Sequence, residues 1–139
     1  MWNFPSAATR HRRDAKQLLA TSPANARYLS GYVVECALKA VVESSDALFR
    51  APAFGHQLAR LERDEMDLAV ALTPRSARYR PAAATVKCVQ QSWSETLRYS
   101  ATSDTSGQVA ARMVDAAADV HRSTVVEMFL DGLLDEPPV

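Results

Sequence analysis

The chain has 139 residues, 47% of them hydrophobic and 23% charged, and its 16 basic and 16 acidic residues give a formal net charge of zero. This length suits one domain with a single core, and the composition excludes a disordered chain. Residues 1–16 lack the apolar run of a secretory signal, and no segment has the roughly 18 apolar residues of a membrane span, so we expect a cytoplasmic protein without membrane contact.

Helical spacing dominates the apolar pattern, and no stretch alternates cleanly between apolar and polar residues, so we expect a single all-α domain over residues 1–139. Its core is expected at about 6–134, with a frayed tail at 135–139. The first helix should begin near Ser6 and end before the Thr-Ser-Pro turn at 21–23.

The second helix should run from Pro23 to about Ser44, because proline is favoured in the first helical turn. Its main apolar stripe follows steps of three and four residues. Gly31 lies within it and costs about 1 kcal/mol relative to alanine, so it either permits close approach of a neighbouring helix or has no role.

The second half of the chain divides at its polar and proline-rich segments. A loop at 45–55 precedes a short helix from His56 and a weaker helical segment, and 74–81 forms a break between two prolines. A further helix is expected from about Ala82 to Leu97. The last helix should extend from Gln108 to Leu134, capped by a polar residue at 104, 105 or 106.

Two cysteines, Cys36 and Cys88, stand singly in apolar surroundings and are expected to be reduced core thiols. No spacing typical of metal ligands and no glycine-rich phosphate loop occurs, so we expect no metal and no cofactor. A cluster of carboxylates is expected to be solvated: Glu62, Asp64, Glu65 and Asp67.

Charge is distributed unevenly, since residues 1–27 and 75–99 are basic and the remaining segments are acidic. If the basic segments meet in space they form an anion-binding face; otherwise they are solvated helix surfaces. Trp93, in the second basic segment, is expected in the core, with base stacking as the alternative.

Tyr28, Tyr32, Glu35 and Lys39 are spaced by four, three and four residues and therefore share one helical face. One interpretation is an exposed intrahelical ion pair worth about 0.2–0.5 kcal/mol. The other places this face at a groove or a partner helix, where tyrosine hydroxyls and a screened ion pair are useful.

Three segments carry a resemblance to the HEPN domain family, a family of helical nucleotide-, RNA- and partner-binding modules. Residues 14–42, "DAKQLLATSPANARYLSGYVVECALKAVV", resemble its first two helices. Residues 55–61, "GHQLARL", resemble its His-x-Leu-x-x-Leu, and residues 92–100, "SWSETLRYS", resemble the Trp and Arg-Tyr before its final helix. The resemblance spans about residues 8–130.

The resemblance implies a four- to five-helix, up-and-down bundle of HEPN type, which often pairs as a two-fold dimer. It implies a non-catalytic module that binds RNA, a nucleotide or a nucleotidyltransferase-type protein partner, in a system of toxin–antitoxin or defence character. It places Tyr28, Tyr32, Glu35 and Lys39 at a groove or interface. The residues expected to bind RNA or a nucleotide are Arg78, Arg80, Arg98 and Tyr99.

Catalytic members of the family are metal-independent endoribonucleases in which an arginine and a following histidine, with four to six residues between them, lie near the last helix. Here His121 lies in the last helix without an arginine at that spacing. Arg50 and His56 have the spacing but precede the third helix. A ribonuclease using His56 or His121 with an arginine from a dimer mate, and a dimerisation scaffold without a ligand, remain the two alternatives.

Overall fold

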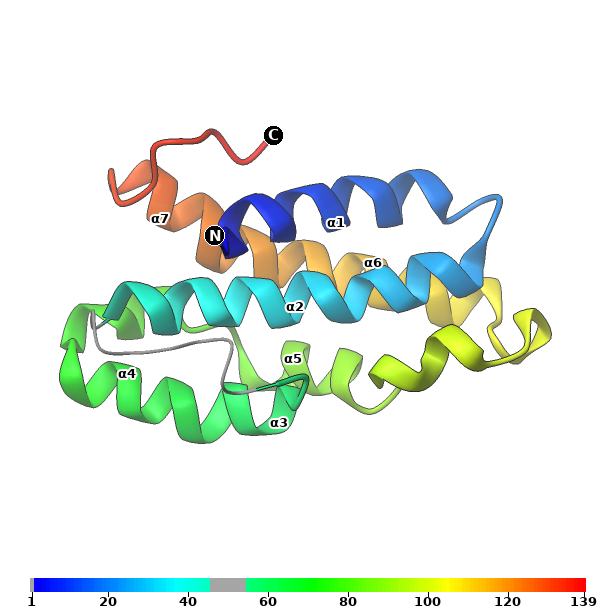
Figure 1. Ribbon diagram of the computed structural model, residues 1–139, viewed down its shortest axis with the longest axis horizontal. Helices are drawn as coiled ribbons and strands as arrows, with labels where there is room; N and C mark the ends of the chain where they lie inside the picture. Colours follow the sequence, from blue (N-terminus) through cyan, green and yellow to red (C-terminus); the bar gives the residue numbers. More distant parts are fainter. Residues whose placement is uncertain (1, 46–54) are drawn as a thin grey trace.

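The computed structural model describes residues 2–45 and 55–139, and within these ranges it contains helices and no strand (Figure 1). This confirms the all-α prediction. The α-helices in chain order are α1 (Phe4–Leu18), α2 (Pro23–Ser45), α3 (Leu58–Arg60), α4 (Met66–Leu72), α5 (Ala83–Gln90), α6 (Gly107–His121) and α7 (Glu127–Leu130). Wider π-turns join α3 to α4 (η2, Leu61–Glu65) and α6 to α7 (η6, Arg122–Val126), and 3-10 turns form η3 (Pro74–Tyr79), η4 (Glu95–Tyr99) and η5 (Thr102–Asp104).

Helix α2 is the central element of the bundle, with α1 above it, α6 behind it and the α3–α4 and α5 segments below it in Figure 1. Helices that are apolar on all sides are found in the interior of a fold. Val33, Val34, Leu38, Val41 and Val42 are all fully buried in α2. The core therefore surrounds α2.

Five helical stretches of eight or more residues occur in the part of the chain that the structure describes: 4–18, 23–45, 58–72, 83–90 and 107–130. Their directions do not alternate strictly. Helix α2 and the 58–72 stretch both run toward the left of Figure 1. Accordingly His56 contacts Glu35 midway along α2, while the Thr73 hydroxyl donates to the carbonyl of Ser45 at its end. The expected up-and-down order is thus wrong at this pair.

The helix starts follow capping chemistry. Helix α1 begins at Phe4, ahead of the expected Ser6, because the Asn3 side chain accepts a hydrogen bond from the Ser6 N–H. Pro23 is the first residue of α2, as predicted. Ser106 is the residue that caps α6, and its side chain accepts from the N–H of Val109.

Helix α5 ends at Gln90, seven residues before the expected end at Leu97. The reason is tertiary: Trp93 leaves the helical path to lie over Gly31 of α2. Its indole Nε1 donates to the carbonyl of Tyr28 at 2.9 Å, and its side chain is 9% exposed. The core assignment of Trp93 is confirmed. Gly31 does permit a close approach, but by the Trp93 indole and not by the neighbouring helix that was expected.

The last helical stretch ends at Leu130 rather than Leu134, because Gly132 takes a left-handed conformation with φ +78°. The N–H of Leu133 bonds to the carbonyl of Met128, and the N–H of Gly132 bonds to that of Phe129. This is the Schellman arrangement that commonly terminates helices at a glycine.

The two cysteines differ in their surroundings. Cys36 is buried, and burial together with the Glu35 carboxylate raises the pKa of its thiol to about 12. Cys88 is exposed, so its assignment to the core is wrong. It lies on the solvent side of the short helix α5, whose buried face is formed by Val86 and Val89.

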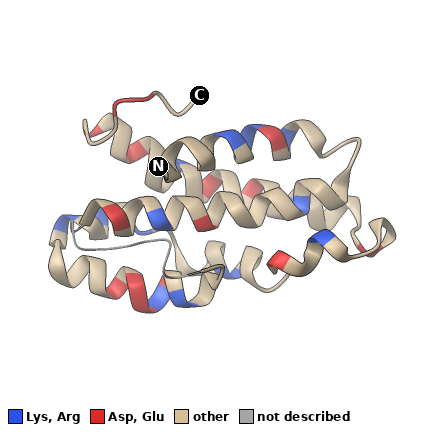
Figure 2. Ribbon diagram, in the orientation of Figure 1, with Lys and Arg blue, Asp and Glu red and all other residues tan. Residues whose placement is uncertain are grey.

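The two basic segments do not merge into one face. Figure 2 shows the Lys and Arg positions of α1 on one side of α2 and those of α5 and η4 on the other side. No helix in the described part of the chain is both long and apolar enough to span a membrane.

Candidate ligand pocket

A pocket of about 550 Å³ lies where the first turns of α1 cross the middle of α2. Aromatic, basic and buried polar side chains meet in its wall. The lining side chains include Trp2, Phe4, Arg10, His11, Tyr32, Glu35, Lys39 and His56. A volume of this size is within the range that holds one small molecule.

Glu35 and Lys39 form a buried ion pair in this wall. The Lys39 Nζ donates to Glu35 Oε1 at 2.7 Å, and each residue is only 4% exposed. The ammonium also lies 5.6 Å from the centre of the Phe4 ring. The exposed-pair interpretation is therefore wrong, and the pair instead borders a pocket.

His56 completes a three-residue polar cluster. Its Nδ1 lies 2.8 Å from Glu35 Oε2, so the two carboxylate oxygens of Glu35 serve Lys39 and His56 separately. His56 stands two residues before α3 begins at Leu58, rather than starting the helix as expected. Its side chain remains 45% exposed, which leaves the rest of the imidazole available at the pocket.

Tyr32 lies at the centre of an aromatic group. Its ring centre is 5.9 Å from that of His11, 5.7 Å from His56 and 5.1 Å from Trp93. Burial, followed by the hydrogen bond with Tyr28, raises the pKa of Tyr32 above its usual value. Burial, followed by the charge of Arg10, lowers the pKa of His11. Two imidazoles thus flank one neutral tyrosine.

Tyr28 extends this group away from the pocket. The hydroxyls of Tyr28 and Tyr32 are 3.1 Å apart, and their rings meet edge to face. Of the four residues predicted along one face of α2, Tyr32, Glu35 and Lys39 line the pocket, whereas Tyr28 lies one helical turn away.

Arg98 and Tyr99 lie on the surface at the Tyr28 end of this group. The Arg98 guanidinium carbon is 4.9 Å from the centre of the Tyr99 ring, and Tyr99 is 76% exposed. The hydroxyl of Tyr99, followed by those of Tyr28 and Tyr32, raises the pKa of Arg98. A stacked cation and an open aromatic ring therefore adjoin the tyrosine pair.

Arg78 and Arg80 lie elsewhere and are held by carboxylates. Arg78 Nε is 2.6 Å from Asp131 Oδ2, and its Nη2 is 3.5 Å from Glu127 Oε2. Arg80 Nη1 is 2.6 Å from Asp67 Oδ1, and its Nη2 donates to the carbonyl of Glu62. These contacts account for both side chains without a ligand.

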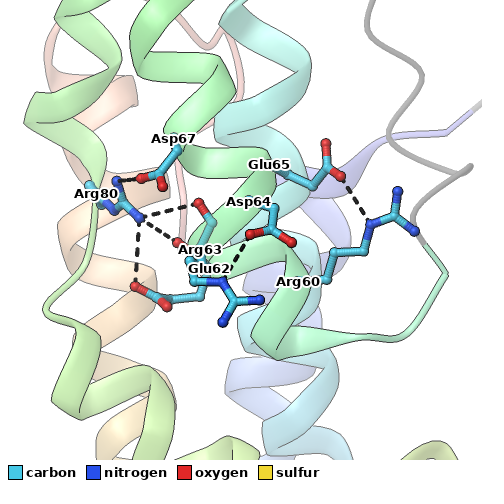
Figure 3. Close-up of polar contacts among 7 residues, drawn as sticks. All are labelled: Arg60, Glu62, Arg63, Asp64, Glu65, Asp67 and Arg80. Carbon is cyan, nitrogen blue, oxygen red and sulfur yellow. Dashed lines mark hydrogen bonds and ion pairs between the residues drawn. The ribbon is translucent and has the colours of Figure 1, made fainter.

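The carboxylate cluster around the η2 turn is a network of ion pairs (Figure 3). Glu65 is 6% exposed and accepts from Arg60 Nε at 3.1 Å. The prediction of a solvated run is therefore wrong for Glu65, while Asp64 and Asp67 are exposed as expected. No group of three or more His, Cys, Asp or Glu placed to hold a metal occurs in residues 2–45 and 55–139.

His121 lies far from solvent, between α1 and α6. It is 2% exposed, and its Nε2 is 2.9 Å from the Thr9 hydroxyl. Burial, followed by the charge of Arg12, lowers the pKa of His121 to about 4. His121 is thus an interior residue. Arg50, the arginine spaced for His56, lies outside the described residues.

The stability of the fold is expected to depend on this histidine. Because the folded state disfavours the imidazolium, the unfolded chain binds more protons between its pKa of about 6.5 and the folded value of about 4. The free energy of unfolding should therefore fall by about 1–2 kcal/mol from pH 7 to pH 5 through His121. Urea unfolding of wild type and His121→Gln at both pH values measures this.

His11 also lowers the free energy of unfolding as the pH falls, because its pKa is lowered in the folded state. The contribution of His121 is therefore the difference between the pH dependence of the wild type and that of His121→Gln. The glutamine keeps a polar atom for Thr9 but does not titrate. An identical pH dependence in His121→Gln would contradict the assignment.

Sequence reasoning missed the α1 side of the pocket. Phe4 and His11 are seven residues apart, close to two helical turns, and therefore lie on one face of α1. This spacing can be read from the sequence, but it does not indicate that this face of α1 packs beside Glu35 and Lys39 of α2.

Comparisons with protein-family models, with curated proteins and with solved structures found no match.

Proposed function

We propose that this chain is a non-catalytic HEPN-like module that binds RNA or a nucleotide through phosphate and base contacts. The observation that carries the proposal is the pocket that adjoins an exposed cation and ring. Its wall holds Arg10 and Lys39, and Arg98 stacked on Tyr99 lies beyond the tyrosine pair. Single-stranded nucleic acids are commonly bound by such combinations of cations and stacking aromatics.

The chemistry of each part suits such a ligand. Arginine pairs with phosphate oxygens through two parallel N–H donors, and Arg10 is exposed at the pocket rim. Tyr99 offers most of its ring to solvent, so a base can stack on it. The proposal does not use Arg78 or Arg80, because Asp131 and Asp67 already pair with them.

The proposal keeps the partners that the resemblance implies. A nucleotidyltransferase-type protein and a toxin–antitoxin or defence setting rest on the HEPN-like segments alone, and a cytoplasmic location rests on the apolar pattern of the sequence. We also propose that the chain forms a homodimer. If it binds no ligand, the remaining alternative is a dimerisation scaffold.

Binding of a fluorescent single-stranded RNA at several salt concentrations tests the proposal. The affinity should fall steeply as salt rises, because phosphate contacts release counterions. Tyr99→Ala should weaken binding by about 1–3 kcal/mol, the usual value for one stacked base, and Arg98→Ala should reduce the salt dependence.

The matched control is Arg63→Ala, which removes an exposed arginine that pairs only with neighbouring Asp64 across the described residues. It should leave affinity unchanged. Equal losses in Arg63→Ala and Arg98→Ala, or binding that is indifferent to salt, would contradict the proposal.

A metal-independent endoribonuclease is the second candidate, favoured by the geometry of His56. A carboxylate on Nδ1 leaves Nε2 to accept a proton from a 2′-hydroxyl, and His11 lies across Tyr32 as a second proton carrier. His121 does not fit this role, because it is buried against Thr9.

A further inference from the structure

The pocket is large enough for one nucleotide. Its volume is about 550 Å³, and the start of α1, the middle of α2 and the chain at His56 form its sides. Trp2 and Phe4, whose rings are stacked with centres 6.1 Å apart, stand at the α1 side. Tyr32 stands on α2.

The charges in the wall favour an anion. Glu35 is neutralised within the wall by Lys39, which leaves the charge of Arg10 uncompensated there. Within the described residues Arg10 has no ion pair. His11 adds a ring nitrogen that can donate to oxygen.

We propose that the pocket binds a nucleotide by its terminal phosphate monoester, with Arg10 at the phosphate and the aromatic side chains at the base. This inference rests on the proposed function and specifies its ligand. A monoester carries about −1.5 to −2 charges near pH 7, whereas an internal diester carries about −1. A terminal group also enters a pocket without requiring a second exit for the strand.

The same monoester occurs on a free nucleoside monophosphate and on a 5′-phosphorylated RNA end. The Arg98–Tyr99 pair distinguishes these sources, because it lies outside the pocket where only a longer ligand can reach it. An RNA end should therefore lose affinity in Tyr99→Ala, and a free nucleoside monophosphate should not.

The test compares four ligands by equilibrium binding to the full chain: a nucleoside 5′-monophosphate, and one single-stranded RNA sequence carrying a 5′-phosphate, carrying a 5′-hydroxyl, or closed into a circle. The 5′-phosphorylated RNA should bind about five- to tenfold more tightly than the other two RNAs, as expected for one additional charge-assisted contact. Arg10→Ala should reduce this preference to about twofold or less.

Arg13→Ala is the matched control, because Arg13 lies on the same helix, is exposed and does not line this pocket. It should keep the preference. Equal affinity for phosphorylated, hydroxyl and circular RNA would overturn the inference while leaving RNA binding intact, whereas no binding of any ligand would overturn the proposed function with it. Both variants replace exposed side chains, and their thermal unfolding confirms that they fold.

Discussion

Glu35→Gln is expected to lower the free energy of unfolding by about 3–5 kcal/mol, the usual cost of removing one partner from a buried ion pair. The amide retains the shape of the carboxylate but leaves the Lys39 ammonium uncompensated at 4% exposure. It also removes the anionic acceptor of His56. Urea unfolding at pH 7 followed by circular dichroism measures the change.

Glu43→Gln provides the control on the same helix, because Glu43 is exposed. Partial desolvation raises the pKa of its carboxyl, so the charged form is not stabilised by the fold and its loss costs little. The double variant Glu35→Gln with Lys39→Met should recover part of the loss, since no buried charge remains. A change below about 1 kcal/mol in Glu35→Gln, the usual value of an exposed pair, would contradict the buried pair.

Gly31→Ala is expected to lower the free energy of unfolding by about 3 kcal/mol. A Cβ at this position would lie 2.0 Å from Cε2 of Trp93, much closer than any real contact. The indole would have to move away and lose its hydrogen bond to the Tyr28 carbonyl. Thermal and urea unfolding should show this loss, and Trp93 fluorescence should shift toward that of an exposed indole.

Gly107→Ala is the matched control, because nothing lies within 4 Å of a Cβ at that position and it begins α6. Alanine there should raise stability by about 0.5 kcal/mol through the lower entropy of the unfolded chain. If Gly31→Ala were also neutral or stabilising, the contact between Trp93 and α2 would be wrong.

The sequence predicts the helices well where local chemistry determines them. Pro23 marks the start of α2, and a polar residue before α6 marks its cap, and both are found. The end of the last helix was predictable as well, because Gly132 is the residue type that terminates helices. The end of α5 was not, because Trp93 leaves the helix for a contact 62 residues away in sequence at Gly31.

Of the residues that line the pocket, only those on α2 could be predicted from the sequence. The spacing of Tyr32, Glu35 and Lys39 indicates a shared face but not its burial. Burial follows from α1 packing over that face, which is a tertiary event that places Phe4 against Lys39. For the same reason the sequence did not reveal that Arg78 and Arg80 are held in ion pairs. Their partners, Asp131 and Asp67, come from other elements.

We propose that the chain binds RNA or a nucleotide without cleaving it. Incubation of end-labelled single-stranded RNA with the protein in EDTA, followed by native and denaturing gels, tests it most directly. We expect retarded RNA on the native gel at low salt and intact RNA on the denaturing gel. Cleavage that is lost in His56→Ala would establish the ribonuclease instead, and free, intact RNA at low salt would contradict binding altogether.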